Sequence, residues 1–276
     1  PRASEELRQG RDRPRLGLWM LWSVTMSAAM SLAPAPTPRR LDAVLFDIDG
    51  TLLNSDALHL AVFQDVLQEE GFNGGDRIDE AFFMRHISGR QNAQICADLF
   101  PDWPVDRGVA FSARKEQRFR ELAAAKLPAL VTPGLHALCA ALAAQDVRCA
   151  AVTNAPRANA ELMLGAIGAV AGKESLSFFS PLIIGDELSH AKPHPEPYLA
   201  AMRLLGVEAE NCLAFEDSPS GAAAAVAAGT QTVGITSTQT AEKLKEAGCS
   251  IAIRNFEDPG LAALLRDAWT LRAALP

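Results

Sequence analysis

Residues 41–52 read LDAVLFDIDGTL, and this stretch decides the fold class. Residues 43–46 form a short, wholly apolar run of the kind found in strands that are buried on both faces of a parallel sheet. Asp47 and Asp49 follow at alternate positions. Because side chains two residues apart point to the same side of a strand, both carboxylates can face one side at its carboxyl end.

The rest of the chain repeats this pattern. Further short apolar runs predict strands at 149–152, 182–184, 213–215, 232–235 and 251–253. Helical patterns lie between them, at 135–144, 159–167, 196–205, 221–228 and 240–247. Such alternation predicts an α/β fold with a doubly wound parallel sheet and helices on both of its faces.

One interval departs from the alternation. Residues 57–68, 92–99 and 109–125 show apolar residues at three-and-four spacing, which predicts a small helical bundle. We therefore expect a core domain of residues 41–56 and 131–276 and an inserted helical cap domain of residues 57–130. Ligands of such sheets bind beyond the carboxyl ends of the strands, so this insertion is placed to act as a lid.

The composition excludes several classes of protein. The 276 residues are 49% hydrophobic, which fits a globular chain and excludes disorder as a whole. A net charge of -7 without a basic cluster after residue 40 argues against nucleic-acid binding. Five widely spaced cysteines fit buried thiols in a reducing compartment better than disulfides or a zinc site. We expect a monomer without nucleic-acid or membrane partners.

Residues 1–40 differ from the remainder. Arg8, Arg11, Arg13 and Arg15 precede an apolar stretch from Leu16 to Ala33, and alternating prolines follow. This composition is typical of a targeting segment or a linker, and an over-extended start is the third interpretation. We treat residues 1–40 as a non-core extension and expect a cytoplasmic protein, or a plastid one if this segment is a transit peptide.

Polar residues stand at the ends of later strands as well. Thr153-Asn154 follows the second strand, Lys192 lies among prolines before a helix, and Glu216-Asp217 ends the fourth strand. A carboxylate pair suits covalent phosphoryl transfer, with one group as nucleophile and the other moving protons. A hydroxyl with backbone amides suits phosphoryl oxygens. The second acidic pair, with Asp47, can hold a hard cation, for which Mg²⁺ is the default.

Each motif also has a purely structural interpretation. Asp49-Gly50 is a frequent hairpin turn. Thr153-Asn154 and Ser218 are frequent helix caps, and a lysine beside prolines is common on surfaces. It is the joint occurrence of the motifs, in order and at strand ends, that favours a catalytic site.

Asp47-Asp49, Thr153, Lys192 and Glu216-Asp217 together resemble the four-motif signature of the haloacid dehalogenase-like (HAD) hydrolase superfamily, over about residues 41–255. The resemblance implies a Rossmann-like core with a helical cap. It further implies that Asp47 is the nucleophile, which becomes an aspartyl phosphate, and that Asp49 is the general acid and base.

The remaining roles that the resemblance implies concern binding. Thr153 and Lys192 would hold the transferring phosphoryl, and Asn154 belongs with them as a phosphate-binding residue. The Asp217 carboxylate, the Asp47 carboxylate and the Asp49 carbonyl would bind Mg²⁺, with Glu216 in support. Because dehalogenases of this superfamily lack the second aspartate, Asp49 disfavours dehalogenation.

The cap region resembles that of sugar phosphatases and β-phosphoglucomutase. His59, Arg90 in the loop Ser88-Gly89-Arg90, and Lys115 match substrate-binding positions. Their structural alternatives are a core histidine and two charges on solvated helix faces. Residues 71–73, 152–156, 159–163 and 192–195 also resemble plant sugar-phosphate phosphatases of broad range.

This resemblance implies Mg²⁺-dependent hydrolysis of hexose, pentose and also glycerol phosphates. A β-phosphoglucomutase-like phosphomutase is the alternative, and a non-catalytic sugar-phosphate-binding protein is a third interpretation.

Overall fold

A six-stranded parallel sheet lies at the centre of the computed structural model, which describes residues 39–270. Its order is β6-β3-β2-β7-β8-β9, and each neighbouring pair is parallel. The strands are β2 (Ala43–Phe46), β3 (Arg148–Thr153), β6 (Leu182–Ile184), β7 (Cys212–Glu216), β8 (Gln231–Ile235) and β9 (Ile251–Ile253). All six predicted strands are present within one residue of their expected bounds, and the α/β fold class is confirmed.

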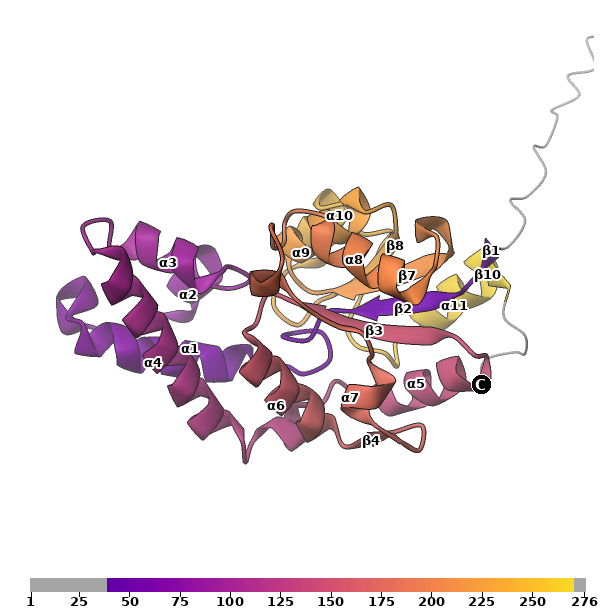
Figure 1. Ribbon diagram of the computed structural model, residues 1–276, viewed down its shortest axis with the longest axis horizontal. Coiled ribbons are helices and arrows are strands. Elements are labelled where there is room, and N and C mark those ends of the chain that lie inside the picture. The colour runs from indigo at the N-terminus through magenta and orange to yellow at the C-terminus, as the bar shows by residue number, and fades with distance from the viewer. Residues whose placement is uncertain (1–38, 271–276) are drawn as a thin grey trace, which may run out of the picture. The chain divides into compact units, whose positions relative to one another are not determined.

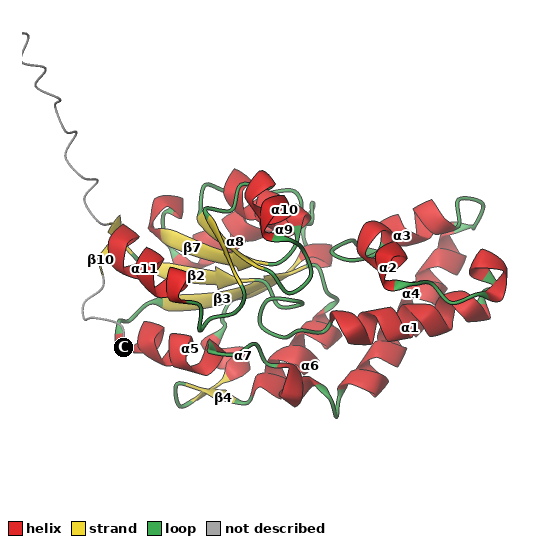
Figure 2. Ribbon diagram, turned by 180° about the vertical axis from the view of Figure 1, so that it is seen from behind, coloured by secondary structure: helices red, strands yellow, loops and turns green. Residues whose placement is uncertain are grey.

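Helices cover both faces of this sheet, as Figures 1 and 2 show. Along β2, Val44 and Phe46 join one apolar cluster while Ala43 and Leu45 join another, because alternate side chains point to opposite faces. The first cluster includes residues of α5 (Leu135–Ala144), α6 (Arg157–Ile167) and α11 (Pro259–Ala268). The second includes residues of α8 (Glu196–Leu205) and α9 (Pro219–Ala227).

Aromatic packing fixes the end of β2, from which Asp47 leaves. The Phe46 ring stacks on Phe215 of the neighbouring strand, with centroids 5.3 Å apart, and makes edge contacts with Phe179 and Phe256. All four rings are buried. Close packing of this kind leaves the backbone before Asp47 little freedom to move.

Four helices follow β2 before α5 begins. They are α1 (Asp56–Glu69), α2 (Glu80–His86), α3 (Asn92–Leu99) and α4 (Val105–Ala123), and they form a group at one end of the sheet (Figure 1). Helical periodicity in the sequence predicted α1, α3 and α4 but not α2. That helix has seven residues, of which only Phe83 is buried, so it carries too little periodicity to be recognised. The division into core and cap domains at residues 57–130 stays a proposal.

The smaller elements complete the described chain. They are α7 (Ser175–Phe178), α10 (Ala241–Glu246), the antiparallel pair β4 (Ala169–Val170) and β5 (Lys173–Glu174), the parallel pair β1 (Arg39–Arg40) and β10 (Trp269–Thr270), and four short 3₁₀ helices. The 3₁₀ helices are η1 (Phe72–Gly75), η2 (Leu127–Leu130), η3 (Gly185–Glu187) and η4 (Ala209–Asn211).

Two expectations concern the chain as a whole. All five cysteines are buried and free, as the sequence predicted. Within residues 39–270, none of the helices combines the length and apolar character that crossing a membrane requires. The N-terminal extension predicted for residues 1–40 lies almost wholly outside the described residues.

Candidate active site

The predicted site residues gather at the carboxyl end of the sheet. Asp47 directly follows β2, and Thr153 is the last residue of β3. Glu216 is the last residue of β7, and Asp217 follows it in the sequence. A pocket at this edge is lined by residues of the core and of the helical insertion. Of the predicted site residues it includes Asp47, Asp49, His59, Arg90, Lys115, Thr153, Asn154, Lys192 and Asp217. Glu216 lies behind this lining and is fully buried.

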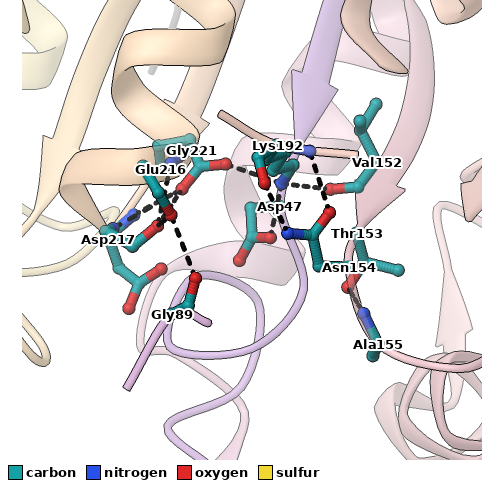
Figure 3. A network of polar contacts seen from close by, with 12 residues as sticks. Asp47, Gly89, Val152, Thr153, Asn154, Ala155, Lys192, Glu216, Asp217 and Gly221 are labelled. Carbon is teal, nitrogen blue, oxygen red and sulfur yellow. Dashed lines mark hydrogen bonds and ion pairs between the residues drawn. The ribbon is translucent and has the colours of Figure 1, made fainter. Parts of the chain in front are cut away.

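Lys192 connects three of these strand ends (Figure 3). Its ammonium donates to Asp47 Oδ1 at 2.8 Å, to Glu216 Oε1 at 2.6 Å and to the carbonyl of Val152 at 2.7 Å. Burial lowers the pKa of this lysine, but the charges of Asp47 and Glu216 outweigh burial and raise it overall. Lys192 is therefore a permanent cation whose three donors are all used.

Asn154 holds the backbone of Lys192. Its side-chain amide accepts from the Lys192 N–H and donates to the Lys192 carbonyl, both at 3.1 Å. This pairing gives the Asn154 side chain a positioning role, and the phosphate binding predicted for Asn154 stays a prediction. Thr153 is buried, and its hydroxyl oxygen accepts from the N–H of Ala155 at 2.9 Å, which fixes the turn that leaves β3.

Three buried carboxylates lie close together here, and two of them, Asp47 and Glu216, contact Lys192. Asp47, Glu216 and Asp217 each present an oxygen within 4.8 Å of the others. Burial raises the pKa of Asp217, and the charges of Asp47 and Glu216 raise it further; burial likewise raises the pKa of Asp47. Asp47 Oδ2 is buried without a hydrogen-bond partner among the described residues. Excess negative charge and an orphaned carboxylate oxygen fit a hard divalent cation such as Mg²⁺.

The two acidic residues at the end of β7 differ in how fully their carboxylate oxygens are engaged by hydrogen bonds. Glu216 Oε1 accepts from Lys192 and, at 2.7 Å, from the hydroxyl of Tyr198, while Oε2 accepts from the Asp217 N–H. Asp217 Oδ2 accepts from Thr238 at 2.7 Å, and its carboxylate lines the pocket. Asp217 is thus the residue of this pair whose carboxylate oxygen can bind a cation, and Glu216 supports it by accepting from its backbone N–H. Ser218 also caps α9 through Gly221, so the cap and the acidic motif coexist.

Glycine is required beside two of these carboxylates. A Cβ at Gly50, whose φ is +77°, would lie 2.1 Å from Asp217 Oδ2, and one at Gly221 would lie 2.0 Å from Glu216 Oε1. The Asp49-Gly50 pair therefore brings the backbone close to Asp217 rather than forming a hairpin between strands.

We expect Gly221→Ala to destabilise the protein by about 1–3 kcal/mol, because Glu216 is pinned by Lys192 and Tyr198 and cannot move aside. Gly165→Ala in α6 is the matched control: its added Cβ meets no atom within 4 Å, so it should leave stability equal or higher. Urea unfolding of both variants measures this. Equal stability of the two would contradict the close packing around Glu216.

Asp49 belongs to a second polar chain, which leads into the helical insertion. Its Oδ1 accepts from the Ser55 hydroxyl at 2.7 Å and lies 2.8 Å from His59 Nε2, while Lys115 Nζ lies 3.3 Å from His59 Nδ1. Burial raises the pKa of Asp49, but the contacts with His59 and Ser55 outweigh it and lower the pKa overall. In this state Asp49 is a carboxylate, ready to accept a proton.

The helical insertion supplies the other predicted site residues. His59 stacks on Phe119, with centroids 4.1 Å apart, and Lys115 is buried against Glu116, which its ammonium meets at 2.9 Å. A solvated helix face is therefore the wrong interpretation for Lys115. Arg90 lines the pocket while its guanidinium donates to the carbonyl of His86 and pairs with Asp98.

Several residues of the site were not recognised in the sequence. They are Ser55, Asp56, Asn92, Glu116, Asn159, Asp186, Tyr198 and Thr238. Lys115 lies between Phe111 and Phe119 at helical spacing, which places it on the apolar face of α4. Because charged residues are unusual on such a face, the adjacent pair Lys115-Glu116 could have marked Glu116 as a site residue. The other contacts depend on how distant segments pack, and no local pattern marks them.

Comparison with known proteins agrees with the fold. The family model described as haloacid dehalogenase-like hydrolase matches residues 41–229. Validoxylamine A 7'-phosphate phosphatase of Streptomyces hygroscopicus subsp. limoneus is 34% identical over 207 residues, covering 74% of this chain and 89% of that protein. Phosphoglycolate phosphatase of Rhodospirillum rubrum is 32% identical over 232 residues, covering 79% and 89%.

A solved structure is also similar. A HAD hydrolase of family IA, variant 3, from Entamoeba histolytica superposes with a TM-score of 0.67 at 26% identity, covering 78% of this chain and 94% of that one. The chain belongs to the haloacid dehalogenase-like hydrolase family. The predicted enzyme class, a phosphoric monoester hydrolase, is confirmed by this family together with relatives that are named phosphatases.

Proposed function

We propose that this chain is a Mg²⁺-dependent phosphatase of small sugar phosphates, including hexose, pentose and glycerol phosphates, which acts through an aspartyl phosphate on Asp47. The observation that carries the proposal is the environment of Asp47. Lys192 donates to Oδ1, whereas Oδ2 is buried, has no hydrogen-bond partner within residues 39–270, and lies beside a pocket that also contains Asp49. One carboxylate is thus poised as nucleophile and a second stands ready for proton transfer.

The first step forms the covalent intermediate. Asp47 attacks phosphorus as the bond to the sugar oxygen breaks, and Asp49 donates a proton to that oxygen. The negative charge of a bound phosphate raises the pKa of a nearby carboxyl, so substrate binding itself favours the protonated form of Asp49. Lys192, fixed by Asn154, stabilises the charge that gathers around phosphorus.

The second step releases phosphate. Asp49, now a carboxylate, takes a proton from water as that water attacks phosphorus, and the bond between phosphorus and Asp47 breaks. Mg²⁺, when held by the Asp47 and Asp217 carboxylates and the Asp49 carbonyl, supplies positive charge that offsets the phosphate. Glu216 supports these groups by fixing Lys192 and the start of α9.

Two relatives support phosphate-monoester substrates by name, one a validoxylamine A 7'-phosphate phosphatase and the other a phosphoglycolate phosphatase. The helical insertion contributes His59, Arg90 and Lys115 to the pocket, and we assign the sugar moiety to these residues. A cytoplasmic monomer, or a plastid one, remains our proposal from the sequence.

Phosphate release from a panel of sugar, glycerol and nucleoside phosphates tests this function. We expect release with Mg²⁺ from several sugar phosphates, loss of release with a chelator, and a loss of about 10²–10⁴-fold in Asp49→Ala, because general acid–base catalysis contributes this much. Release that is unaffected by the chelator and by Asp49→Ala would contradict the proposal.

The same assay separates the alternatives. A phosphomutase would consume a sugar 1-phosphate and form the 6-phosphate without equivalent phosphate release. A binding protein would show calorimetric binding of sugar phosphates but no turnover with Mg²⁺. Phosphate release equal to substrate loss excludes both.

A further inference from the structure

The part of the pocket lining that follows His59 and Lys115 carries a distinctive set of charges. We define this leaving-group end by Gln91, Asn92, Lys115, Glu116, Asn159 and Asp186, all of which line the pocket. It is connected to the reacting end through His59, which lies 2.8 Å from Asp49 on one side and 3.3 Å from Lys115 on the other. A substrate whose phosphoryl group meets Asp47 would have its leaving group within this pocket, where these residues form part of the lining.

Glu116 is the centre of this end. Its side chain is buried, and its Oε1 accepts from Lys115 at 2.9 Å and from Asn92 at 2.6 Å. Its Oε2 accepts from Asn159 at 2.5 Å, so the carboxylate joins the helical insertion to α6 of the core. Burial alone would raise the pKa of Glu116, but Lys115 and Asn92 outweigh burial and lower it, which keeps this group ionised.

The two cations that face the pocket from the insertion are both already paired. Lys115 is paired with Glu116, and Arg90 with Asp98. The leaving-group end itself contributes two carboxylates, Glu116 and Asp186. Asp186 accepts from Gln91 at 2.9 Å, a neutral partner that leaves its charge uncompensated. The described residues of the leaving-group end therefore carry no surplus positive charge.

Two side-chain amides of this end, Gln91 and Asn92, offer donors and acceptors without charge, which is what hydroxyl groups require. Asn159 is buried, and its amide is engaged by Arg120 and Glu116. A second anionic group on the substrate would lose its hydration and meet the carboxylates of Glu116 and Asp186 at short range. Repulsion of this kind is an effective means of substrate discrimination.

We propose that Glu116, assisted by Asp186, selects phosphate monoesters whose leaving group is an uncharged polyol and rejects those with a second phosphate or a carboxylate. This inference rests on the proposed phosphatase function and names its substrate class. It distinguishes the chain from its phosphoglycolate phosphatase relative, whose named substrate carries a carboxylate.

Two pairs of substrates that differ only by a carboxylate test it. Glycerol 3-phosphate is compared with 3-phosphoglycerate, and sorbitol 6-phosphate with 6-phosphogluconate. In each pair a terminal CH₂OH is replaced by a carboxylate. We expect wild-type kcat/KM to favour the uncharged member by about tenfold or more, since one unscreened charge contact in such a site is worth at least this factor.

Glu116→Gln should raise the relative kcat/KM of the carboxylated member by about tenfold, because it removes the repelling charge and frees Lys115. Asp186→Asn is the second variant and should shift the ratio in the same direction. Glu116→Gln must repack against Asn159, so it could fail to fold. Asp186→Asn then still tests the inference. Glu121→Gln, an exposed change on the same helix, is the matched control and should leave the ratio unchanged.

The outcomes separate the two proposals. Hydrolysis that favours the carboxylated members, or a ratio unmoved by both variants, would overturn the inference while leaving the phosphatase function intact. An equal loss for both members of a pair would show that Glu116 is merely structural, and would overturn it too. Absence of hydrolysis of any phosphate ester by wild type would instead overturn the proposed function.

Discussion

Replacing Asp47 with asparagine is expected to lower kcat by about 10⁴-fold or more, since no neighbouring side chain can take over the attack on phosphorus. Asp49 lies close by but is bound to Ser55 and His59, and Glu216 is turned toward Lys192 and Tyr198. The measurement is phosphate release under Mg²⁺ with the best substrate of the panel.

The fold should survive this change. Burial raises the pKa of Asp47, and the nearby charge of Glu216 raises it further, so a neutral amide relieves a repulsion as well as weakening the contact with Lys192. We expect a melting temperature close to that of wild type. Asp102→Asn, an exposed change outside the pocket, is the control and should keep full activity. Sustained turnover by folded Asp47→Asn would remove the basis of the mechanism.

Replacing Lys192 with methionine is expected to cost both stability and activity. The variant leaves Asp47 and Glu216 buried without their shared cation, and breaking a buried ion pair on one side typically costs about 3–5 kcal/mol. Turnover should also be lost, because the phosphoryl group loses its fixed positive charge. Urea unfolding and phosphate release measure the two effects.

A second substitution separates the two effects of Lys192→Met. Adding Glu216→Gln removes one of the stranded charges, so the double variant should recover part of the lost stability but none of the activity. Lys126→Met, on an exposed lysine, should be neutral in both measurements. Wild-type stability of Lys192→Met would show that the three-carboxylate cluster does not depend on this cation.

Much of the fold follows from local patterns in the sequence. The central strands of the sheet are buried on both faces, so their residues are mostly apolar and the runs are easy to recognise; the burial of all four residues of β2 is an example. The proximity of Asp47 and Asp217 also follows, because the ends of parallel strands meet at one edge of the sheet. The helix α11 was not predicted, although Asp258 caps its start and Leu261 and Leu265 lie on its buried side at helical spacing.

The contacts between the helical insertion and the core could not be predicted in the same way. Lys115 and Glu116 lie on one helix, yet their partners His59 and Asn159 come from segments far away in the sequence. Helical periodicity gives the face on which a residue lies, but not the element that this face meets. The partner of Asn154 could not be predicted either, because its side chain binds the backbone of Lys192, which lies 38 residues later in the sequence.

Trapping the covalent intermediate on Asp47 tests most directly whether this residue is the nucleophile. Wild-type protein in turnover with Mg²⁺ and its best sugar phosphate is quenched in acid and reduced with borohydride, which converts an aspartyl phosphate to homoserine. Peptide mass spectrometry then locates the change. The account predicts homoserine at Asp47, only when substrate is present and never in Asp47→Asn. Hydrolysis without any reduced residue at position 47, or with the change at another carboxylate, would contradict it.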